Sequence, residues 1–190
     1  IKGGEIPIDP LSFNFAVISP EDKRFRDDPV AKEKVRNSIP IADVNFADYD
    51  LIMISGGWGA AYDLAQSPLL AEKITEAYYS DNKPLIGGVC HGVLGLVSAR
   101  DRNGEHLISG RKVTGVTDKQ INELRIGVTP LHPETELRKV GAQFESRTAF
   151  RDFFATHVVV DEEKRFVTGQ NQNSGLEASH LMMRLLAQRG

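Results

Sequence analysis

The single cysteine of the chain lies in a glycine frame that is typical of a nucleophilic thiol. Cys90 ends a short apolar run and is flanked two residues on either side by Gly88 and Gly92, which gives the pattern G-x-C-x-G. This is the thiol version of a strand-turn-helix elbow, in which side chains at the glycine positions would collide with the backbone. The N–H groups that begin the next helix favour the reactive thiolate. A lone cysteine is otherwise a small buried hydrophobe, but the glycine frame favours a functional thiol.

A nucleophilic thiol also needs a base, a group that orients the base, and donors for an oxyanion. His91 is the candidate base. Because neighbouring helical side chains diverge by about 100°, His91 reaches the sulfur only if the elbow is distorted or the substrate lies between them; otherwise it only shapes the turn. Asp118 is the candidate that orients His91, and a helix N-cap is its alternative, compatible role. The candidate oxyanion donors are the N–H groups of Gly57, Trp58 and His91.

These residues follow predicted strands, so the order of elements decides whether they meet. Apolar runs at residues 50–55, 84–89 and 112–116 predict strands, and residues 156–160 and 165–168 predict a hairpin. Helices are predicted at residues 28–37, from Ser67 with Leu69 facing inward, after Cys90, from near Asp118, at 133–140, and from a capping box of Ser174 and Glu177. This alternation predicts an α/β sandwich with a mostly parallel sheet and a site at the carboxyl ends of its strands.

Composition describes an ordinary globular chain and argues against several functions. The 190 residues are 41% hydrophobic and 26% charged, which fits one domain over residues 1–190. A net charge of −3 without a basic cluster gives no reason to expect a nucleic-acid partner. No apolar run approaches the roughly 18 residues of a membrane span. One cysteine cannot form an internal disulfide, so we expect a cytoplasmic protein. Three histidines lack metal-ligand spacing, so we expect no metal: His106, His157 and His180.

Four segments, in order along the chain, resemble the DJ-1/PfpI superfamily. They are residues 50–60, 88–92, 110–115 and 168–171. More narrowly, they are similar to its glyoxalase III and heat-inducible chaperone branch, which is also described as type 1 glutamine amidotransferase-like. The similarity extends from about residue 2 to the C-terminus. It implies a flavodoxin-like three-layer sandwich with a nucleophile elbow, a homodimer, no cofactor, and a catalytic site of Cys90, His91 and Asp118.

The chain departs from the family pattern in three places. Some relatives place the acid of the site slightly later, as a glutamate; Ile121 stands there, so Asp118 is preferred and Glu123 is the reserve. Many relatives have histidine where this chain has Trp58, which changes the pocket wall. Relatives also begin with a strand-helix-strand unit whose glutamate hydrogen-bonds the cysteine. This chain opens at Ile1 without a methionine, so we expect an N-terminally incomplete domain, in which a separate segment supplies that acid or the polypeptide is inactive.

The resemblance implies that a 2-oxoaldehyde such as methylglyoxal is converted to a 2-hydroxy acid without glutathione. The Cys90 thiolate would attack the aldehyde, and His91 and the unassigned glutamate would transfer protons. Two other classes of function remain open. One is a thiol amidohydrolase or peptidase-like enzyme that uses the same cysteine. The other is a stress chaperone, or a redox sensor in which Cys90 oxidises to the sulfinate.

Overall fold

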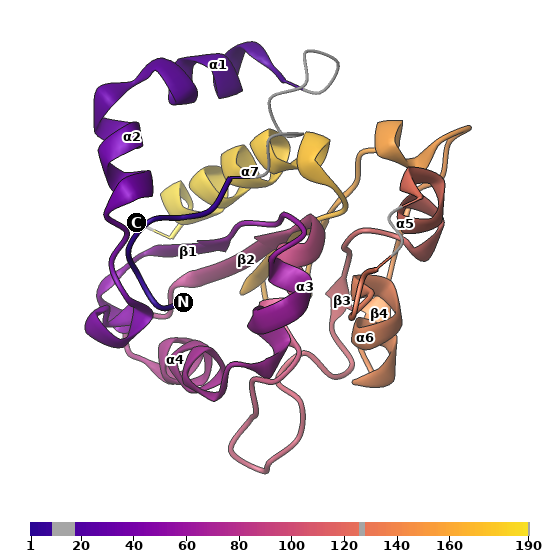
Figure 1. The fold of residues 1–190 in the computed structure, drawn as a ribbon. Coiled ribbons are helices and arrows are strands. Elements are labelled where there is room, and N and C mark those ends of the chain that lie inside the picture. The colour runs from indigo at the N-terminus through magenta and orange to yellow at the C-terminus, as the bar shows by residue number, and fades with distance from the viewer. Residues whose placement is uncertain (9–17, 126–127, 190) are drawn as a thin grey trace. The chain divides into compact units, whose positions relative to one another are not determined.

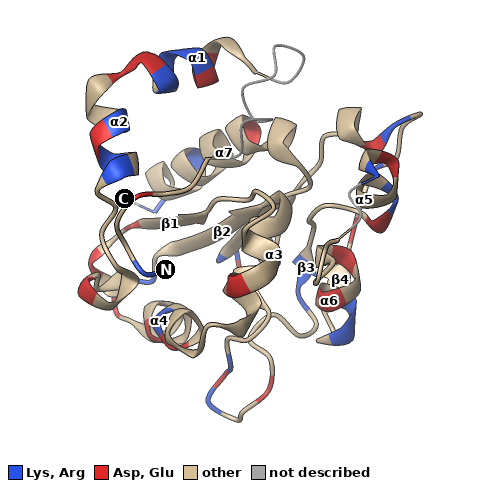
Figure 2. Ribbon diagram, in the orientation of Figure 1, with Lys and Arg blue, Asp and Glu red and all other residues tan. Residues whose placement is uncertain are grey.

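The computed structural model describes residues 1–8, 18–125 and 128–189, and the chain divides into two compact units, residues 1–45 and 46–190. The first unit holds α1 (Pro20–Asp27), α2 (Pro29–Arg36) and the short 3-10 helix η2 (Ile41–Asp43). Asp28 caps α2 by accepting hydrogen bonds from the N–H groups of Val30 and Ala31. The helix predicted over residues 28–37 is therefore confirmed. Both helices carry dense charge of both signs (Figure 2).

The second unit is built on a four-stranded sheet. Its strand order is β1 (Leu51–Ile54), β2 (Leu85–Val89), β6 (Phe166–Gly169) and β5 (Val158–Val160). The first three strands are parallel, and β5 runs antiparallel to β6. This confirms the mostly parallel sheet and the predicted hairpin. Strands β1 and β2 carry no charged residue (Figure 2), which suits strands that are covered on both faces.

Helices cover both faces of this sheet (Figure 1). One face packs against α7 (Gly175–Ala187), and its core contains Leu85, Val167, Ala178 and Met182. The other face is covered by α3 (Ala60–Asp63), α4 (Pro68–Tyr79) and the 3-10 helix η5 (Cys90–Leu96). The predicted three-layer α/β sandwich is confirmed. Across the described residues, no helix combines the length and the apolar character that crossing a bilayer requires.

A smaller region beside the main sheet carries the remaining elements. Strands β3 (Lys112–Val113) and β4 (Gln143–Phe144) pair in parallel, and α5 (Asp118–Leu124) and α6 (Pro133–Lys139) lie near them. The strand predicted over residues 112–116 is thus shorter than expected, because the N–H of Thr114 turns to the hydroxyl of Thr168 at 2.8 Å instead of continuing the ladder. Short 3-10 helices complete the unit: η3 (Phe46–Asp48), η4 (Leu64–Gln66), η6 (Asp152–Phe154) and η7 (Gln172–Ser174).

Three local predictions are wrong. The N-cap of α5 is Thr117 rather than Asp118, because the Thr117 hydroxyl accepts from the N–H of Gln120 at 3.0 Å. Ser174 does not form a capping box with Glu177: its backbone is already helical, and the capping box joins Asn171 and Ser174 at the start of η7. On α4, Leu69 is exposed, whereas Leu70, Ile74 and Ala77 face the core.

Candidate active site

Cys90 lies at a strained turn where β2 ends and η5 begins. Its φ angle is +57°, a left-handed conformation that side chains other than glycine rarely adopt. A Cβ atom at Gly92 would collide with the carbonyl oxygen of Ile54, and one at Gly88 would lie 3.0 Å from the backbone nitrogen of Val93. The glycine frame therefore exists for the reason that the sequence suggests: the helix starts too close to the sheet to admit side chains there.

Three backbone N–H groups surround the Cys90 sulfur, and they come from three different turns. They belong to His91, Gly57 and Gln172, at the carboxyl ends of β2, β1 and β6. Gly57 and His91 are among the donors expected from the sequence, whereas Trp58 is not among the three. Gln172 was not expected, although its turn follows a strand at the same edge of the sheet. The rule that reactive groups gather at the carboxyl ends of parallel strands was the signal that could have found it.

The surrounding protein withdraws the Cys90 sulfur from water, which favours the protonated thiol over the thiolate. Cys90 is half-buried, and burial raises the pKa of its thiol to about 11, although the N–H groups of His91, Gly57 and Gln172 act to lower it. The raised pKa disfavours the resting thiolate that the sequence predicts. A reaction at neutral pH needs a base that removes the thiol proton as the sulfur attacks.

His91 is placed to be that base. Its Nδ1 atom lies 3.5 Å from the Cys90 sulfur, so the left-handed turn overcomes the divergence expected of neighbouring helical side chains. The ring is 1% exposed, and burial, together with the charge of His132, lowers the pKa of His91 to about 4. The indole of Trp58 packs on the imidazole with 4.9 Å between ring centroids. His91 is therefore a neutral imidazole at pH 7, able to accept a proton.

Neither predicted carboxylate is bonded to His91 among the described residues. Asp118 accepts hydrogen bonds from Nδ1 of His132 at 3.2 Å and from the hydroxyl of Thr135 at 2.9 Å. The reserve candidate, Glu123, accepts from the backbone N–H of Asp152 at 2.9 Å. The structure thus brings Cys90 and His91 together but engages Asp118 elsewhere.

A small cavity opens beside the sulfur, and we call it the Cys90 cavity. Its volume is about 210 Å³. Among the described residues that line it there is no carboxylate and no cation, and the lining comprises Gly56, Gly57, Trp58, Val89, Cys90, His91, Val116, Gln120, Leu124 and Gln172. No group of three or more potential metal ligands occurs in the part of the chain that the structure describes. The groups available for chemistry here are a thiol, an imidazole, backbone N–H groups and the side-chain amide of Gln120.

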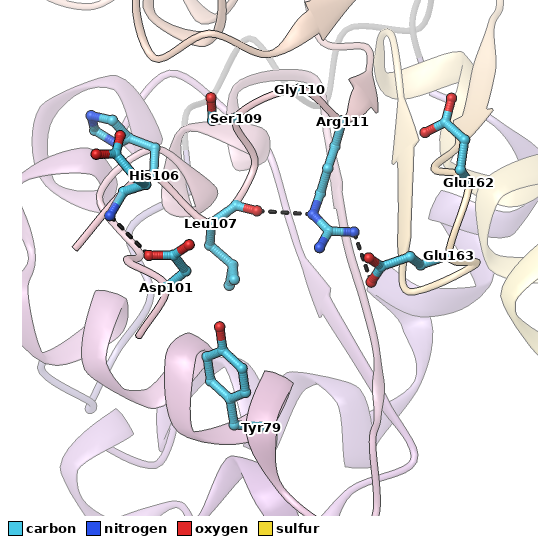
Figure 3. Close-up of a pocket in the computed structure, with 10 residues that line it drawn as sticks. Tyr79, Asp101, His106, Leu107, Ser109, Gly110, Arg111, Glu162 and Glu163 are labelled. Atoms are coloured by element: carbon cyan, nitrogen blue, oxygen red, sulfur yellow. Dashed lines mark hydrogen bonds and ion pairs between the residues drawn. The ribbon is translucent and has the colours of Figure 1, made fainter. Parts of the chain in front are cut away.

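A second cavity lies at the opposite edge of the sheet, and Figure 3 shows the side chains around it; we call it the Arg111 cavity. Its volume is about 470 Å³ and its lining is strongly acidic, with Asp101, Glu105, Glu162 and Glu163. Arg111 points across it and forms an ion pair with Glu163 at 3.0 Å. Its other donors go to Asp161, Leu107 and Tyr78, so this arginine is fully engaged.

Comparisons with known proteins agree with this architecture. The model described as the DJ-1/PfpI family matches residues 11–184. Glyoxalase 3 of Candida albicans is 30% identical over 170 residues, which cover 84% of this chain and 68% of that protein. Five fungal relatives, that one included, have glyoxalase in their names, and the chain spans 55% to 68% of their lengths.

Solved structures give the same result for the fold. The Francisella tularensis protein described as Rapid Encystment Protein 24 kDa superposes with a TM-score of 0.86 at 30% identity, over 97% of this chain and 78% of that one. The crystal structure of glyoxalase III from Candida albicans superposes with a TM-score of 0.79 at 27% identity, over 94% of this chain and 75% of that one. The flavodoxin-like sandwich expected from the sequence is therefore shared with these proteins.

Proposed function

The chain belongs to the DJ-1/PfpI family, and we propose that it converts a 2-oxoaldehyde such as methylglyoxal to a 2-hydroxy acid at Cys90, without glutathione. The observation that carries the proposal is the pairing of a half-buried sulfur at a strained turn with a buried neutral imidazole 3.5 Å away. The names of the fungal relatives support the substrate class.

The size of the Cys90 cavity also supports a small substrate. Drug-sized ligands occupy pockets of roughly 300–1,000 Å³, and this cavity measures about 210 Å³. The indole of Trp58 forms part of its wall and is held by a hydrogen bond from Nε1 to the hydroxyl of Thr129 at 3.0 Å. A three-carbon aldehyde fits these limits better than an extended peptide, which disfavours the peptidase-like alternative.

The first step that we propose forms a hemithioacetal. His91 Nδ1 takes the proton of the Cys90 thiol while the sulfur bonds to the aldehyde carbon. The electron pair of the C=O bond moves to oxygen, and the N–H groups of Gly57 and Gln172 stabilise the oxyanion. The imidazolium then returns its proton to this oxygen. Because the thiol and the imidazole are both neutral at rest, no separated charges need to be held before the substrate arrives.

The second stage moves hydrogen between the two carbonyl carbons. His91 removes the proton from the carbon that carries the sulfur, which gives an enediolate. The imidazolium returns this proton to the neighbouring carbon, and the hydroxyl proton moves to the oxygen on that carbon, which gives a thioester. Water then attacks the thioester, the sulfur leaves with a proton, and the 2-hydroxy acid is released. One carbon is oxidised and its neighbour is reduced, so the net reaction consumes only water and needs no external oxidant or reductant.

Turnover of methylglyoxal by the purified protein in the absence of glutathione tests the proposal. We expect lactate to form in a 1:1 ratio to methylglyoxal consumed, and we expect the Cys90→Ala variant to lose on the order of 10³-fold or more of kcat/KM. His180→Ala, at an exposed position of α7, is the matched control and should retain activity. Equal turnover by Cys90→Ala and the parent protein would exclude Cys90 as the nucleophile. Release of ammonia from amides without lactate formation would favour the amidohydrolase alternative instead.

A further inference from the structure

Two buried polar atoms at the Cys90 cavity lack a hydrogen-bond partner among the described residues. They are Nε2 of His91 and Oε1 of Gln120. Both residues are 1% exposed, and both line the cavity. Buried polar atoms are almost always paired with protein or with ordered water. One of these atoms belongs to a group that can donate and the other is an acceptor, so each is suited to satisfy the other.

The geometry of α5 explains why Gln120, and not Asp118, faces the cavity. Thr117 is the N-cap of this helix, and Gln120 and Ile121 are its buried residues. Residues two positions apart on a helix are separated by about 200° around the axis. Asp118 therefore points away from the side on which Gln120 lies, toward His132 and Thr135.

The position of the sulfur determines which nitrogen of His91 must carry the proton. Nδ1 faces the Cys90 sulfur at 3.5 Å. To accept the thiol proton, Nδ1 must be unprotonated, so the neutral ring carries its hydrogen on Nε2. A hydrogen on Nε2 in a buried site needs an acceptor, and Oε1 of Gln120 is an acceptor without a donor.

We propose that Gln120 is the positioning residue for His91. The two side chains form no direct hydrogen bond in the structure, so one water molecule in the cavity would accept the hydrogen of His91 Nε2 and donate to Gln120 Oε1, which keeps Nδ1 free for the Cys90 thiol. The inference rests on the proposed use of Cys90 as a nucleophile. An amide oxygen is a weaker partner for an imidazolium than a carboxylate is. Gln120 therefore favours a resting pair of neutral thiol and neutral imidazole, whereas an acid at this place would favour thiolate and imidazolium.

The test reads the histidine and the thiol directly and uses no aldehyde substrate. Nitrogen-15 NMR of His91 reports the tautomer and its titration, and the rate of iodoacetamide alkylation of Cys90 between pH 5 and 9 reports the thiolate. The titratable groups that the structure places beside His91 are Cys90 and His132, so His132→Gln is measured alongside. Three variants carry the comparison: Gln120→Glu, Gln120→Met and Asp118→Asn.

We expect Gln120→Met to lose the preference for the Nε2 hydrogen, and Asp118→Asn to keep it. We expect Gln120→Glu to raise the pKa of His91 and to lower that of Cys90. Alkylation at pH 6.5 should become about tenfold faster or more, which corresponds to a fall of one unit or more in the pKa of Cys90. A Gln120 with a merely structural role would give Gln120→Glu and Gln120→Met the same pH profile, and that result overturns the proposal. So does loss of the tautomer preference in Asp118→Asn alone. If Gln120→Glu does not fold, the tautomer in Gln120→Met decides.

The outcome is separable from that of the proposed function. Failure to convert methylglyoxal, together with the expected NMR and alkylation results, would remove the substrate and leave the role of Gln120 intact. Normal lactate formation with an unchanged tautomer in Gln120→Met would support the proposed function and overturn the role of Gln120.

Discussion

The two ends of the parallel strands carry polar groups of opposite character. We call them the Cys90 edge, at the carboxyl ends of the strands, and the Arg111 edge, around the Arg111 cavity. At the Arg111 cavity, the guanidinium donates to the carboxylate of Asp161 at 2.6 Å, to the hydroxyl of Tyr78 at 2.7 Å and to the carbonyl oxygen of Leu107 at 2.9 Å. Asp161 in turn accepts from the backbone N–H groups of Arg165 and Phe166, where β6 begins. At the Cys90 cavity, by contrast, His91 Nε2 and Gln120 Oε1 are buried without partners among the described residues.

This difference distinguishes a region that stabilises the fold from a region that is suited to chemistry. A polar network whose members satisfy one another stabilises a fold but has little capacity left to bind a substrate. Buried polar atoms without partners, close to a strained nucleophile, are costly to the fold and gather at functional sites. The Arg111 edge is not free of such atoms or of backbone strain, since Nε of Arg165 is also unpaired and its neighbour Lys164 has a φ angle of +54°. What distinguishes the Cys90 edge is that its strained residue carries the thiol of the single cysteine. We therefore regard the Arg111 cavity as structural and the Cys90 cavity as reactive.

Replacing Arg111 should have the largest effect on stability and little effect on reactivity. Arg111→Met leaves Asp161, which is 2% exposed, as a buried charge without its cation. We expect a loss of about 3–5 kcal/mol in the free energy of unfolding, measured by urea denaturation. Lys139→Met, which breaks an exposed pair with Glu136, is the control and should cost no more than about 1 kcal/mol. If alkylation of Cys90 slows in the folded Arg111→Met protein, the two edges are coupled and the comparison fails.

Acid should destabilise the Cys90 edge through His91. The pKa of His91 is lowered by burial from the ordinary 6.5 to about 4, so the folded protein binds this proton less readily than the unfolded chain does. The stability that results is fully present above pH 6.5 and is lost as the pH falls to 4. It amounts to roughly 3 kcal/mol.

The measurement compares urea unfolding at pH 7 and pH 4.5 for the parent protein and for His91→Gln. We expect the parent to lose more stability between the two pH values than the variant does, because only the parent carries this histidine. Lys139→Met, which changes the exposed pair with Glu136, should keep the full difference of the parent. Equal losses in the parent and His91→Gln would show that the imidazole is more exposed to water in solution than the structure has it.

The sequence predicted the elements well because their signals are local. Apolar runs closed by glycine mark β1 and β2, and proline at the first helical position marks α2, α4 and α6. The elbow was also predictable, since the glycines around Cys90 reflect contacts within one turn. A homodimer, a cytoplasmic location and a single domain over residues 1–190 remain predictions.

The electrostatic state and the partners of the site were not predictable from local signals. The raised pKa of Cys90 depends on burial by distant elements, which the residues around it do not report. The assignment of Asp118 rested on its resemblance to the acid of the family pattern, which does not report how α5 is turned. Asp118 and Gln120 are separated by about 200° around the axis of α5. The packed structure shows that Gln120 lines the cavity while Asp118 accepts hydrogen bonds from His132 and Thr135.

Filling the space at Gly92 should damage the Cys90 edge specifically. A Cβ atom there would collide with the backbone of Ile54 and Ser55, so Gly92→Ala must shift η5 away from β1. We expect a cost of about 1–3 kcal/mol and slower alkylation of Cys90, because its strained turn relaxes. Gly59→Ala is the control: nothing lies within 4 Å of the new atom and its backbone is right-handed, so it should be neutral or slightly stabilising. A Gly92→Ala protein with normal alkylation would mean that the close approach does not maintain the elbow.

Trp58→Phe should have the smallest effect, and it tests whether the wall of the Cys90 cavity takes part in chemistry. The change keeps an aromatic ring beside His91 and removes the hydrogen bond from the indole Nε1 to Thr129. Losing one such bond costs about 1 kcal/mol, so kcat/KM for the aldehyde should fall less than about tenfold. Thr129→Ala removes the same bond from the other side, and the double variant should be no worse than either single one. If Trp58→Phe abolishes turnover while Thr129→Ala does not, then the indole N–H contacts the reacting oxygen, and the wall belongs with His91 and Cys90 among the catalytic groups.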